Sequence, residues 1–249
     1  LRRDRQHRSA ARQNPLTAVL AMRQVGIRGR LEPLDLRIAI GERVALLGAS
    51  GAGKTTLLSL ANGSLQPDQG QVQWRGQPIR TLPRRRRLEI GTLWQDLRLI
   101  EELTVSRNVN AGALGRHSLL WALRNLLQPL ERRECLAAVT AAGLEPELMD
   151  TTVSRLSGGQ RQRVALARLL RQQPLLVLAD EPLSALDPVL AEEVMVGLLD
   201  QAGCLVSLHR PDLVHRFDRV IGLRQGRLVL DESTGDVTSD AIACLYQSL

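Results

Sequence analysis

The sequence predicts an α/β fold, and the first observation behind that prediction is a strand, a glycine-rich loop and a helix in direct succession. Residues 43–47 (RVALL) have the apolar run of a buried strand, and the loop after them leads into a helix over residues 54–61. Two further apolar runs, residues 175–179 and 203–208, are typical of parallel strands that are buried on both faces. Strands of this kind alternate with helices in α/β domains.

The remaining elements are predicted by alternation, helical periodicity and turn residues. Helices are expected within residues 104–142, mainly at 119–127 and 131–142, and Gly143 suits a C-terminal cap. The other strands are expected at residues 17–25 and 34–40 and in two hairpins, residues 69–80 around Arg75-Gly76 and residues 220–230 around Gln225-Gly226.

Length and composition set the outer limits. The 249 residues, 44% of them hydrophobic, fit one α/β domain or two small lobes. We expect neither a membrane span nor a secretory signal, because no apolar run reaches about 18 residues. Cys135, Cys204 and Cys244 are far apart and lack metal-ligand spacing, so we expect no disulfide framework, no zinc site and a reducing, cytosolic compartment.

The formal net charge of +7 is concentrated at the beginning of the chain. Residues 1–15 contain five arginines and a single aspartate, and we expect them to form a disordered basic arm before a folded domain at residues 16–249. Leu1 suggests an extension from an unusual start. For the arm and for the run Arg84 to Arg87, we favour a solvated surface over a lipid or partner contact.

The loop at residues 48–55 matches the phosphate-binding loop of nucleotide triphosphatases, in its required place between a strand and a helix. Its backbone N–H groups and the helix dipole hold phosphates, while Lys54 reaches the β and γ phosphates and the Thr55 hydroxyl ligates Mg²⁺. The expected nucleotide contacts are Gly48, Ala49, Ser50, Gly51, Ala52, Gly53, Lys54, Thr55 and Thr56.

Lys54 is the single lysine among 33 basic residues, and the other 32 are arginines. This position therefore requires an ammonium group. A compact point charge on a flexible stem enters a tight phosphate cradle, whereas a planar guanidinium does not fit.

Residues 175–181 (LLVLADE) carry two carboxylates to the exit of a buried strand. Asp180 is expected to hold Mg²⁺, and Glu181 is expected to polarise the attacking water. The alternative is a helix cap followed by an acid in the first turn. The phosphate-binding loop in the same chain favours the catalytic interpretation.

Residues 156–168, which begin Leu156-Ser157-Gly158-Gly159-Gln160, resemble the signature motif and helix of ABC ATPases. A helix start capped by serine is the simpler interpretation, and both describe an anion site. Further family motifs follow in order: Gln95 resembles the glutamine of the Q-loop, Ser184-Ala-Leu-Asp187 resembles the D-loop, and His209 resembles the switch histidine. His7, His117 and His215 lack such positions and are expected to be structural. The resemblance covers residues 17–230.

The resemblance implies a P-loop NTPase (RecA-like) core with an antiparallel β subdomain and an ABC-specific α-helical subdomain at about residues 97–157. It also implies ATP and Mg²⁺ as cofactors, with Thr55, Gln95 and Asp180 at the metal. The expected assembly is a head-to-tail homodimer, in which Ser157, Gly158, Gly159, Gln160 and Asp187 complete the partner's site. The resemblance further implies two transmembrane permeases and, indirectly, a periplasmic substrate-binding protein as partners, and no nucleic-acid partner. The expected location is the cytoplasmic face of the inner membrane.

One feature departs from the family. ABC ATPases stack adenine on an aromatic residue shortly before the phosphate-binding loop, but the first aromatic residue here is Trp74. Arg28 lies near the expected position and offers a guanidinium plane instead, so base specificity is expected to be loose.

Three stretches, residues 107–115, 121–130 and 171–182, look like those of phosphonate-importer ATPases. The cargo stays open, because other subunits select it, and phosphite or another oxyanion is an alternative. A soluble ABC protein acting on ribosomes or DNA is disfavoured, since the chain has neither a long coiled-coil insertion nor a second cassette. A non-hydrolysing scaffold is disfavoured because Lys54, Glu181 and His209 are retained.

Overall fold

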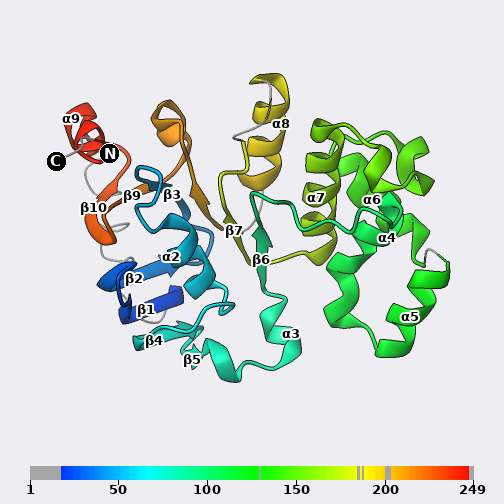
Figure 1. Ribbon diagram of the computed structural model, residues 1–249, viewed down its shortest axis with the longest axis horizontal. Helices are drawn as coiled ribbons and strands as arrows, with labels where there is room; N and C mark the ends of the chain where they lie inside the picture. Colours follow the sequence, from blue (N-terminus) through cyan, green and yellow to red (C-terminus); the bar gives the residue numbers. More distant parts are fainter. Residues whose placement is uncertain (1–17, 129, 184–185, 187, 200–202, 247–249) are drawn as a thin grey trace. The chain divides into compact units, whose positions relative to one another are not determined.

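The computed structural model describes residues 18–128, 130–183, 186, 188–199 and 203–246 (Figure 1). The chain divides into two compact units, and each is described by itself. Unit 1 combines Leu1–Leu82 with Ala202–Leu249, and unit 2 is Pro83–Gln201. The basic arm expected at residues 1–15 lies outside the described residues.

Unit 1 contains an antiparallel sheet in the order β2-β1-β4-β5. Alternation along β1 and β2 places residues such as Leu20 and Met22 in the core opposite Ile38 and Leu36. Trp74, at the end of β4, is fully buried. The strands are β1 (Ala18–Ile27), β2 (Leu31–Ala39), β4 (Gln69–Trp74) and β5 (Gln77–Pro78), so the hairpin expected around Arg75-Gly76 is confirmed.

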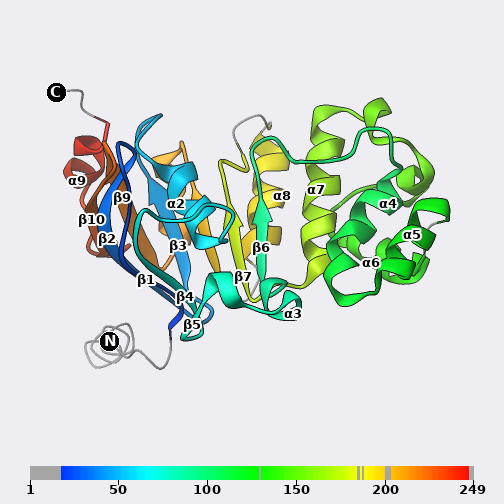
Figure 2. The same cartoon turned by 60° about the horizontal axis from the view of Figure 1, so that its bottom comes forward.

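The second set of strands in unit 1 is largely parallel. β3 (Arg43–Leu47) pairs in parallel with β8 (Cys204–Ser207) on one side and with β9 (Arg219–Arg224) on the other. β9 continues into β10 (Arg227–Ser233) through the expected Gln225-Gly226 turn. Figure 2 shows β10 running beside β2. The helices α2 (Lys54–Ala61) and α9 (Ser239–Cys244) complete the described part of this unit, with short 3-10 turns.

Unit 2 is built around the 15-residue helix α7 (Gly158–Gln172). It packs against α4 (Val105–Asn110), α6 (Arg132–Ala141) and the strand β6 (Ile90–Leu93), which pairs in parallel with β7 (Leu176–Ala179) (Figure 1). The other helices of the unit are α3 (Arg84–Arg87), α5 (Leu119–Leu127) and α8 (Pro188–Leu199).

The helical stretch predicted at residues 104–142 is present but interrupted. A 3-10 segment, Ala111–Arg116, follows α4. Within it, Gly112 packs so closely on α7 that a Cβ there would overlap the carbonyl oxygen of Arg168. The cap expected at Gly143 is confirmed, since this residue has φ 69° and its N–H donates to the Thr140 carbonyl at 2.9 Å.

The arginine run at α3 is mostly exposed. Arg84 donates to the Leu114 carbonyl at 2.6 Å, and Arg86 lies 3.6 Å from Glu89. Arg85 and Arg116 line an open cavity of about 420 Å³ together with Leu88, Glu89, Gln172 and Gln173.

The cysteines are free, as expected: Cys135 and Cys204 are buried and Cys244 is exposed. Burial raises the pKa of the Cys135 thiol to about 11 and that of Cys204 to about 12, so both remain protonated and unreactive near neutral pH. No metal-ligating cluster of His, Cys, Asp or Glu occurs in the part of the chain that the structure describes. Among the described helices, none combines the length and apolar character needed to span a bilayer.

Two glycines with the same backbone conformation test the packing of the antiparallel sheet. Gly70 (φ 80°) and Gly76 (φ 78°) are both left-handed, but a Cβ at Gly70 would overlap the Gln24 carbonyl, whereas one at Gly76 meets nothing within 4 Å. We predict that Gly76→Ala costs about 1 kcal/mol of unfolding free energy and that Gly70→Ala costs at least about 2 kcal/mol more. Urea unfolding of both variants measures this, and equal losses would contradict the close packing.

Candidate nucleotide-binding site

The phosphate-binding loop joins β3 to α2 in unit 1, in the order that the sequence predicts. Gly48 has φ 149°, and a Cβ there would overlap the Leu223 carbonyl of β9. Only glycine therefore allows β3 to end this close to its neighbouring strand. Ser50 and Gly51, by contrast, are exposed, and the position of a Cβ on Gly51 has no neighbour within 4 Å. The loop is thus anchored at its base and open at its tip.

Lys54 begins α2 and is buried, with 4% of its surface exposed. Its ammonium donates to the carbonyl oxygens of Gly48 at 2.8 Å and Ala49 at 3.2 Å, so the side chain curls back along the loop. Gly53, at the N-cap, offers no side-chain cap to the first amides of α2, and Thr55 is exposed. An ammonium and a helix N-terminus that share one loop attract an anion such as phosphate.

His209 lies at the same edge of the sheet as the loop. β3 and β8 are parallel, with Leu46 opposite Ser207, so both strands end on this side. The Leu208 N–H donates to the Leu46 carbonyl at 3.0 Å, and His209 follows as an exposed side chain. Unit 1 therefore brings together the loop, Lys54 and His209.

In unit 2, the ends of two parallel strands also bring two candidate residues to one edge, an amide and a carboxylate. β6 and β7 are parallel with Leu93 opposite Ala179, so Gln95 and Asp180 both follow strand ends at one edge. The backbone N–H of Asp180 donates to the Leu93 carbonyl at 2.8 Å. Asp180 is buried and Gln95 is exposed, which gives this edge an inner carboxylate and an outer amide.

Glu181 has a backbone conformation that is rare for its residue type. Its φ of 49° lies in the left-handed region, and its side chain is partly exposed directly beyond Asp180. Non-glycine residues persist in this region only where the surroundings impose it, and such residues cluster at functional sites.

Ser157 caps the N-terminus of α7 in a reciprocal arrangement. Its hydroxyl accepts from the Gln160 N–H at 3.2 Å, and the Gln160 side chain accepts from the Ser157 N–H at 3.0 Å. Ser157 and Gly158 are exposed, and Gly159 and Gln160 are partly exposed. Hence a serine-capped helix start is present, and its glycine-flanked N-terminus is accessible to an anion.

The expected site residues thus divide between the two units. Lys54, the loop and His209 belong to unit 1, while Gln95, Asp180, Glu181 and residues 157–160 belong to unit 2. Ser184 and Asp187, expected in the D-loop, lie outside the described residues.

Comparison with known families shows which family the chain belongs to. Residues 31–184, more than half of the chain, match the family described as ABC transporter. The chain belongs to this family. Membership in the ABC transporter family implies that the chain binds ATP.

Individual members of the ABC transporter family are similar over most of the chain. The Phosphonates import ATP-binding protein PhnC of Anaeromyxobacter dehalogenans is 43% identical over 94% of this chain, which spans 48% of that protein's length. The protein of the same name from Halobacterium salinarum is 39% identical, with 88% of this chain and 79% of the relative covered. A dimeric ATP-binding cassette solved in a post-hydrolysis state with ADP and Pi superposes with a TM-score of 0.72 at 29% identity, covering 86% and 98% of the two chains.

Sequence reasoning did not identify Arg168 as a structural support of the candidate site. This arginine of α7 donates to the Arg98 carbonyl at 2.6 Å and to the Leu97 carbonyl, both shortly after Gln95. Burial lowers its pKa from the usual value for arginine. Its two partners are some 70 residues away, so neither periodicity nor spacing indicates the contact. Arg168 ties the segment after Gln95 to the helix that Ser157 begins.

The turn at Ile27–Arg30 occupies the position where the adenine residue of the ABC family was expected. The Arg30 N–H donates to the Ile27 carbonyl at 3.1 Å, and the Arg30 carbonyl lies 3.3 Å from where Gly53 would carry a Cβ. Arg28 is exposed at this turn, and its N–H donates to Asp68 at 2.8 Å. An exposed guanidinium therefore lies on a turn that contacts the phosphate-binding loop.

We predict that Arg168→Gln destabilises the segment after Gln95. Two carbonyl oxygens lose a charged donor, which costs about 2–4 kcal/mol of unfolding free energy. Hydrogen exchange at residues 96–101 should accelerate at least about 30-fold, whereas Arg161→Gln, which removes only an exposed pair with Glu101 at 3.7 Å, should leave it within about twofold. Equal exchange in both variants would contradict the role of Arg168.

Proposed function

We propose that this chain is the ATP-hydrolysing subunit of an ABC importer that moves a phosphonate or a related phosphorus oxyanion. The observation that carries the proposal is the similarity to phosphonate import ATP-binding proteins, which extends over 88% to 94% of the chain. Other subunits select the cargo in such systems, so phosphite or a different substrate is an alternative cargo. This alternative leaves the proposed ATPase activity unchanged.

In this proposal, the loop residues Gly48 to Thr56 bind the triphosphate. The backbone amides at the start of α2 face the phosphates, and Lys54 turns its ammonium from the loop carbonyls to the β and γ phosphates. This exchange is favourable because a charge-assisted bond to phosphate is stronger than a bond to a neutral carbonyl.

The residues at the two strand edges suit a magnesium ion. Oxygen ligands are what Mg²⁺ prefers, and Thr55, Gln95 and Asp180 offer a hydroxyl, an amide and a carboxylate. When bound, Mg²⁺ would neutralise negative charge on the phosphates. We assign Asp180 the principal contact, because a buried carboxylate at a strand exit is held in place by its own backbone hydrogen bond to Leu93.

Glu181 is the proposed general base, and His209 is the proposed γ-phosphate contact. Glu181 follows Asp180 directly and has a left-handed backbone with φ 49°. Glu181 orients and deprotonates the attacking water while Lys54 and His209 stabilise the charge on the transferring phosphoryl group.

The accessible N-terminus of α7 suggests that two chains share each ATP. Ser157, Gly158 and Gly159, supported by Gln160, would bind the γ-phosphate of the ATP held by a second copy, with Asp187 crossing the same interface. The solved relative that is dimeric with ADP and Pi supports this head-to-tail homodimer. Closure of the dimer would then drive two membrane-embedded permeases, supplied by a periplasmic binding protein, from the cytoplasmic face of the inner membrane.

Replacement of the proposed base separates ATP binding from hydrolysis. We predict that Glu181→Gln lowers kcat by about 10² to 10³, since general base catalysis contributes on that order, and that the variant accumulates as a dimer with MgATP. Steady-state ATPase assays and light scattering measure both effects.

The matched control for this replacement is Glu147→Gln, which makes the same change at an exposed site in unit 2. It should hydrolyse ATP at the wild-type rate. A Glu181→Gln variant with undiminished turnover would reject Glu181 as the base, and one that loses turnover but stays monomeric with MgATP would reject the shared site.

The missing adenine aromatic can be restored at the Ile27–Arg30 turn. We predict that the wild-type chain discriminates between ATP and GTP by less than about fivefold and that Arg28→Tyr tightens ATP binding about threefold to tenfold, because an aromatic ring stacks on the base. Calorimetric titration with each nucleotide checks this, with Arg23→Tyr, at an exposed position of β1, as the control. Unchanged affinity in Arg28→Tyr would place the adenine elsewhere.

A further inference from the structure

Helix α5 exposes its apolar side chains to solvent. Five leucines of this nine-residue helix have between 50% and 82% of their surface exposed: Leu119, Leu120, Leu123, Leu126 and Leu127. At 3.6 residues per turn they share one stripe about 120° wide. Contiguous exposed apolar surface of this kind marks an interaction site.

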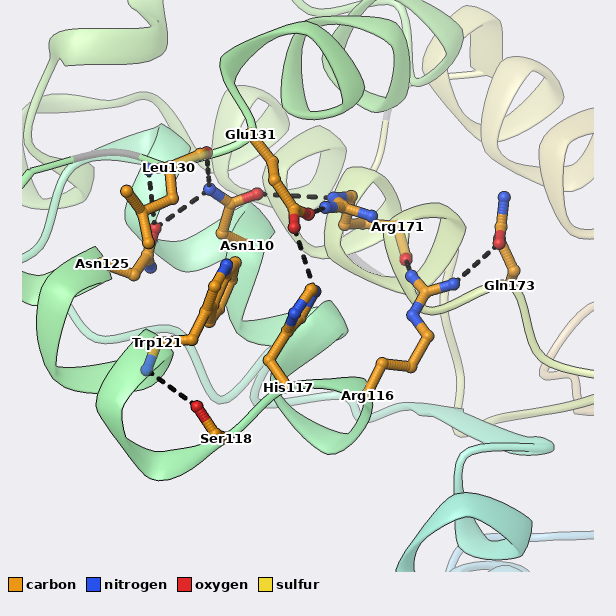
Figure 3. Close-up of polar contacts among 10 residues, drawn as sticks. All are labelled: Asn110, Arg116, His117, Ser118, Trp121, Asn125, Leu130, Glu131, Arg171 and Gln173. Atoms are coloured by element: carbon orange, nitrogen blue, oxygen red, sulfur yellow. Dashed lines mark hydrogen bonds and ion pairs between the residues drawn. The ribbon is translucent and has the colours of Figure 1, made fainter.

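The opposite side of α5 is polar and buried. Asn125 is 3% exposed, and its side-chain oxygen accepts from the Asn110 side chain at 3.0 Å and from the Leu130 N–H at 3.2 Å (Figure 3). Asn110 also donates to the Leu130 carbonyl at 2.6 Å. These bonds fix the rotation of α5, so the leucine stripe faces outward as part of the stable arrangement.

A second set of contacts fixes the two ends of α5 to the helix α7. Glu131 forms an ion pair with the largely buried Arg171 of α7 and lies 3.2 Å from His117 (Figure 3). His117 stacks on Trp121 with ring centroids 4.1 Å apart, and Ser118 caps the helix. His117 is therefore structural, as the sequence predicts, and it holds α5 in place.

The chain segment that carries the leucine stripe is basic. No acidic residue occurs between Leu103 and Leu130, whereas Arg107, Arg116 and Arg124 do. Arg124 lies on α5 beside the stripe and is exposed, and Arg107 donates to the Leu127 carbonyl at 3.1 Å. A partner for this surface must accept apolar side chains and carry negative charge.

We propose that the leucine stripe of α5 inserts into the surface of an anionic lipid bilayer, with Arg124 and Arg107 at the headgroups. An amphipathic helix with leucines on one face and arginines beside them binds membranes in this way. A protein partner fits less well, because the stripe offers neither exposed aromatic anchors nor polar side chains to fix a register, and leucine is rare among the residues that dominate protein interfaces. This contact goes beyond the proposed function, since it needs neither ATP nor permeases.

Flotation with lipid vesicles tests the proposal on the chain itself. The vesicles are phosphatidylcholine alone, or phosphatidylcholine with about one third phosphatidylglycerol. The wild-type chain should float with the anionic vesicles, and Leu123→Ser with Leu127→Ser should lower its partition coefficient at least about tenfold. The double variant Ile40→Ser with Val229→Ser, at exposed apolar positions of unit 1, should bind like the wild type.

Two further measurements distinguish binding through α5 from vesicle binding through other basic parts of the chain. Arg124→Gln should weaken binding to anionic vesicles about fivefold and leave the weak binding to neutral vesicles unchanged. All variants retain the basic residues 1–17 and Arg84 to Arg87, so a loss in the leucine variant identifies α5, and unchanged ATPase activity shows that the variant is folded.

Several outcomes would overturn the proposal. The proposal fails if the wild-type chain does not float with anionic vesicles. It also fails if the leucine variant floats as well as the wild type. Self-association of the wild type that the leucine variant abolishes, without vesicle binding, would assign the stripe to a second copy. Retention of the stripe by a permease in detergent, again without vesicle binding, would assign it to a protein partner.

Discussion

The backbone contact between Gly48 and β9 is the constraint on which the nucleotide site of unit 1 depends. Because Gly48 has no side chain, β3 can end against the Leu223 carbonyl, and the chain must then turn sharply into α2. The Gln225-Gly226 turn lies against the same loop, and the Gly226 N–H donates to the Ala52 carbonyl at 3.1 Å. The loop is therefore held on its strand side and at Ala52, and the Lys54 ammonium lies against the Gly48 and Ala49 carbonyls.

In unit 2, two arginines of α7 hold distant parts of the chain. Arg168 and Arg171 lie almost one turn apart: Arg168 holds the carbonyls after Gln95, and Arg171 holds Glu131, which follows α5 in the sequence. Gln162, on the same helix, donates to the Pro182 carbonyl at 2.8 Å, directly after Glu181. One helix thus contacts the residue after the predicted base, the segment after Gln95 and the residue Glu131 that follows α5.

Local signals in the sequence predicted most of the fold. The bounds of β3 and α2 agree with expectation because a buried apolar run, a glycine loop and a periodic helix each specify their own conformation. The close approach of Gly112 to Arg168, within the interruption at Ala111–Arg116, was not predictable because the two residues lie far apart along the chain. The leucines of α5 have the periodicity of a core helix, and only the hydrogen bonds of Asn125 reveal that they face outward. The candidate site was predictable from motifs, but Arg168 was not, because its role comes from backbone partners that have no sequence pattern.

The dependence of ATP hydrolysis on chain concentration tests the shared site most directly. If each ATP is held between the phosphate-binding loop of one chain and the Ser157 helix of another, the rate per chain must rise with concentration while light scattering shows mainly monomers, and it must level off once dimers predominate. A rate per chain that stays constant across samples containing only monomers would contradict the account.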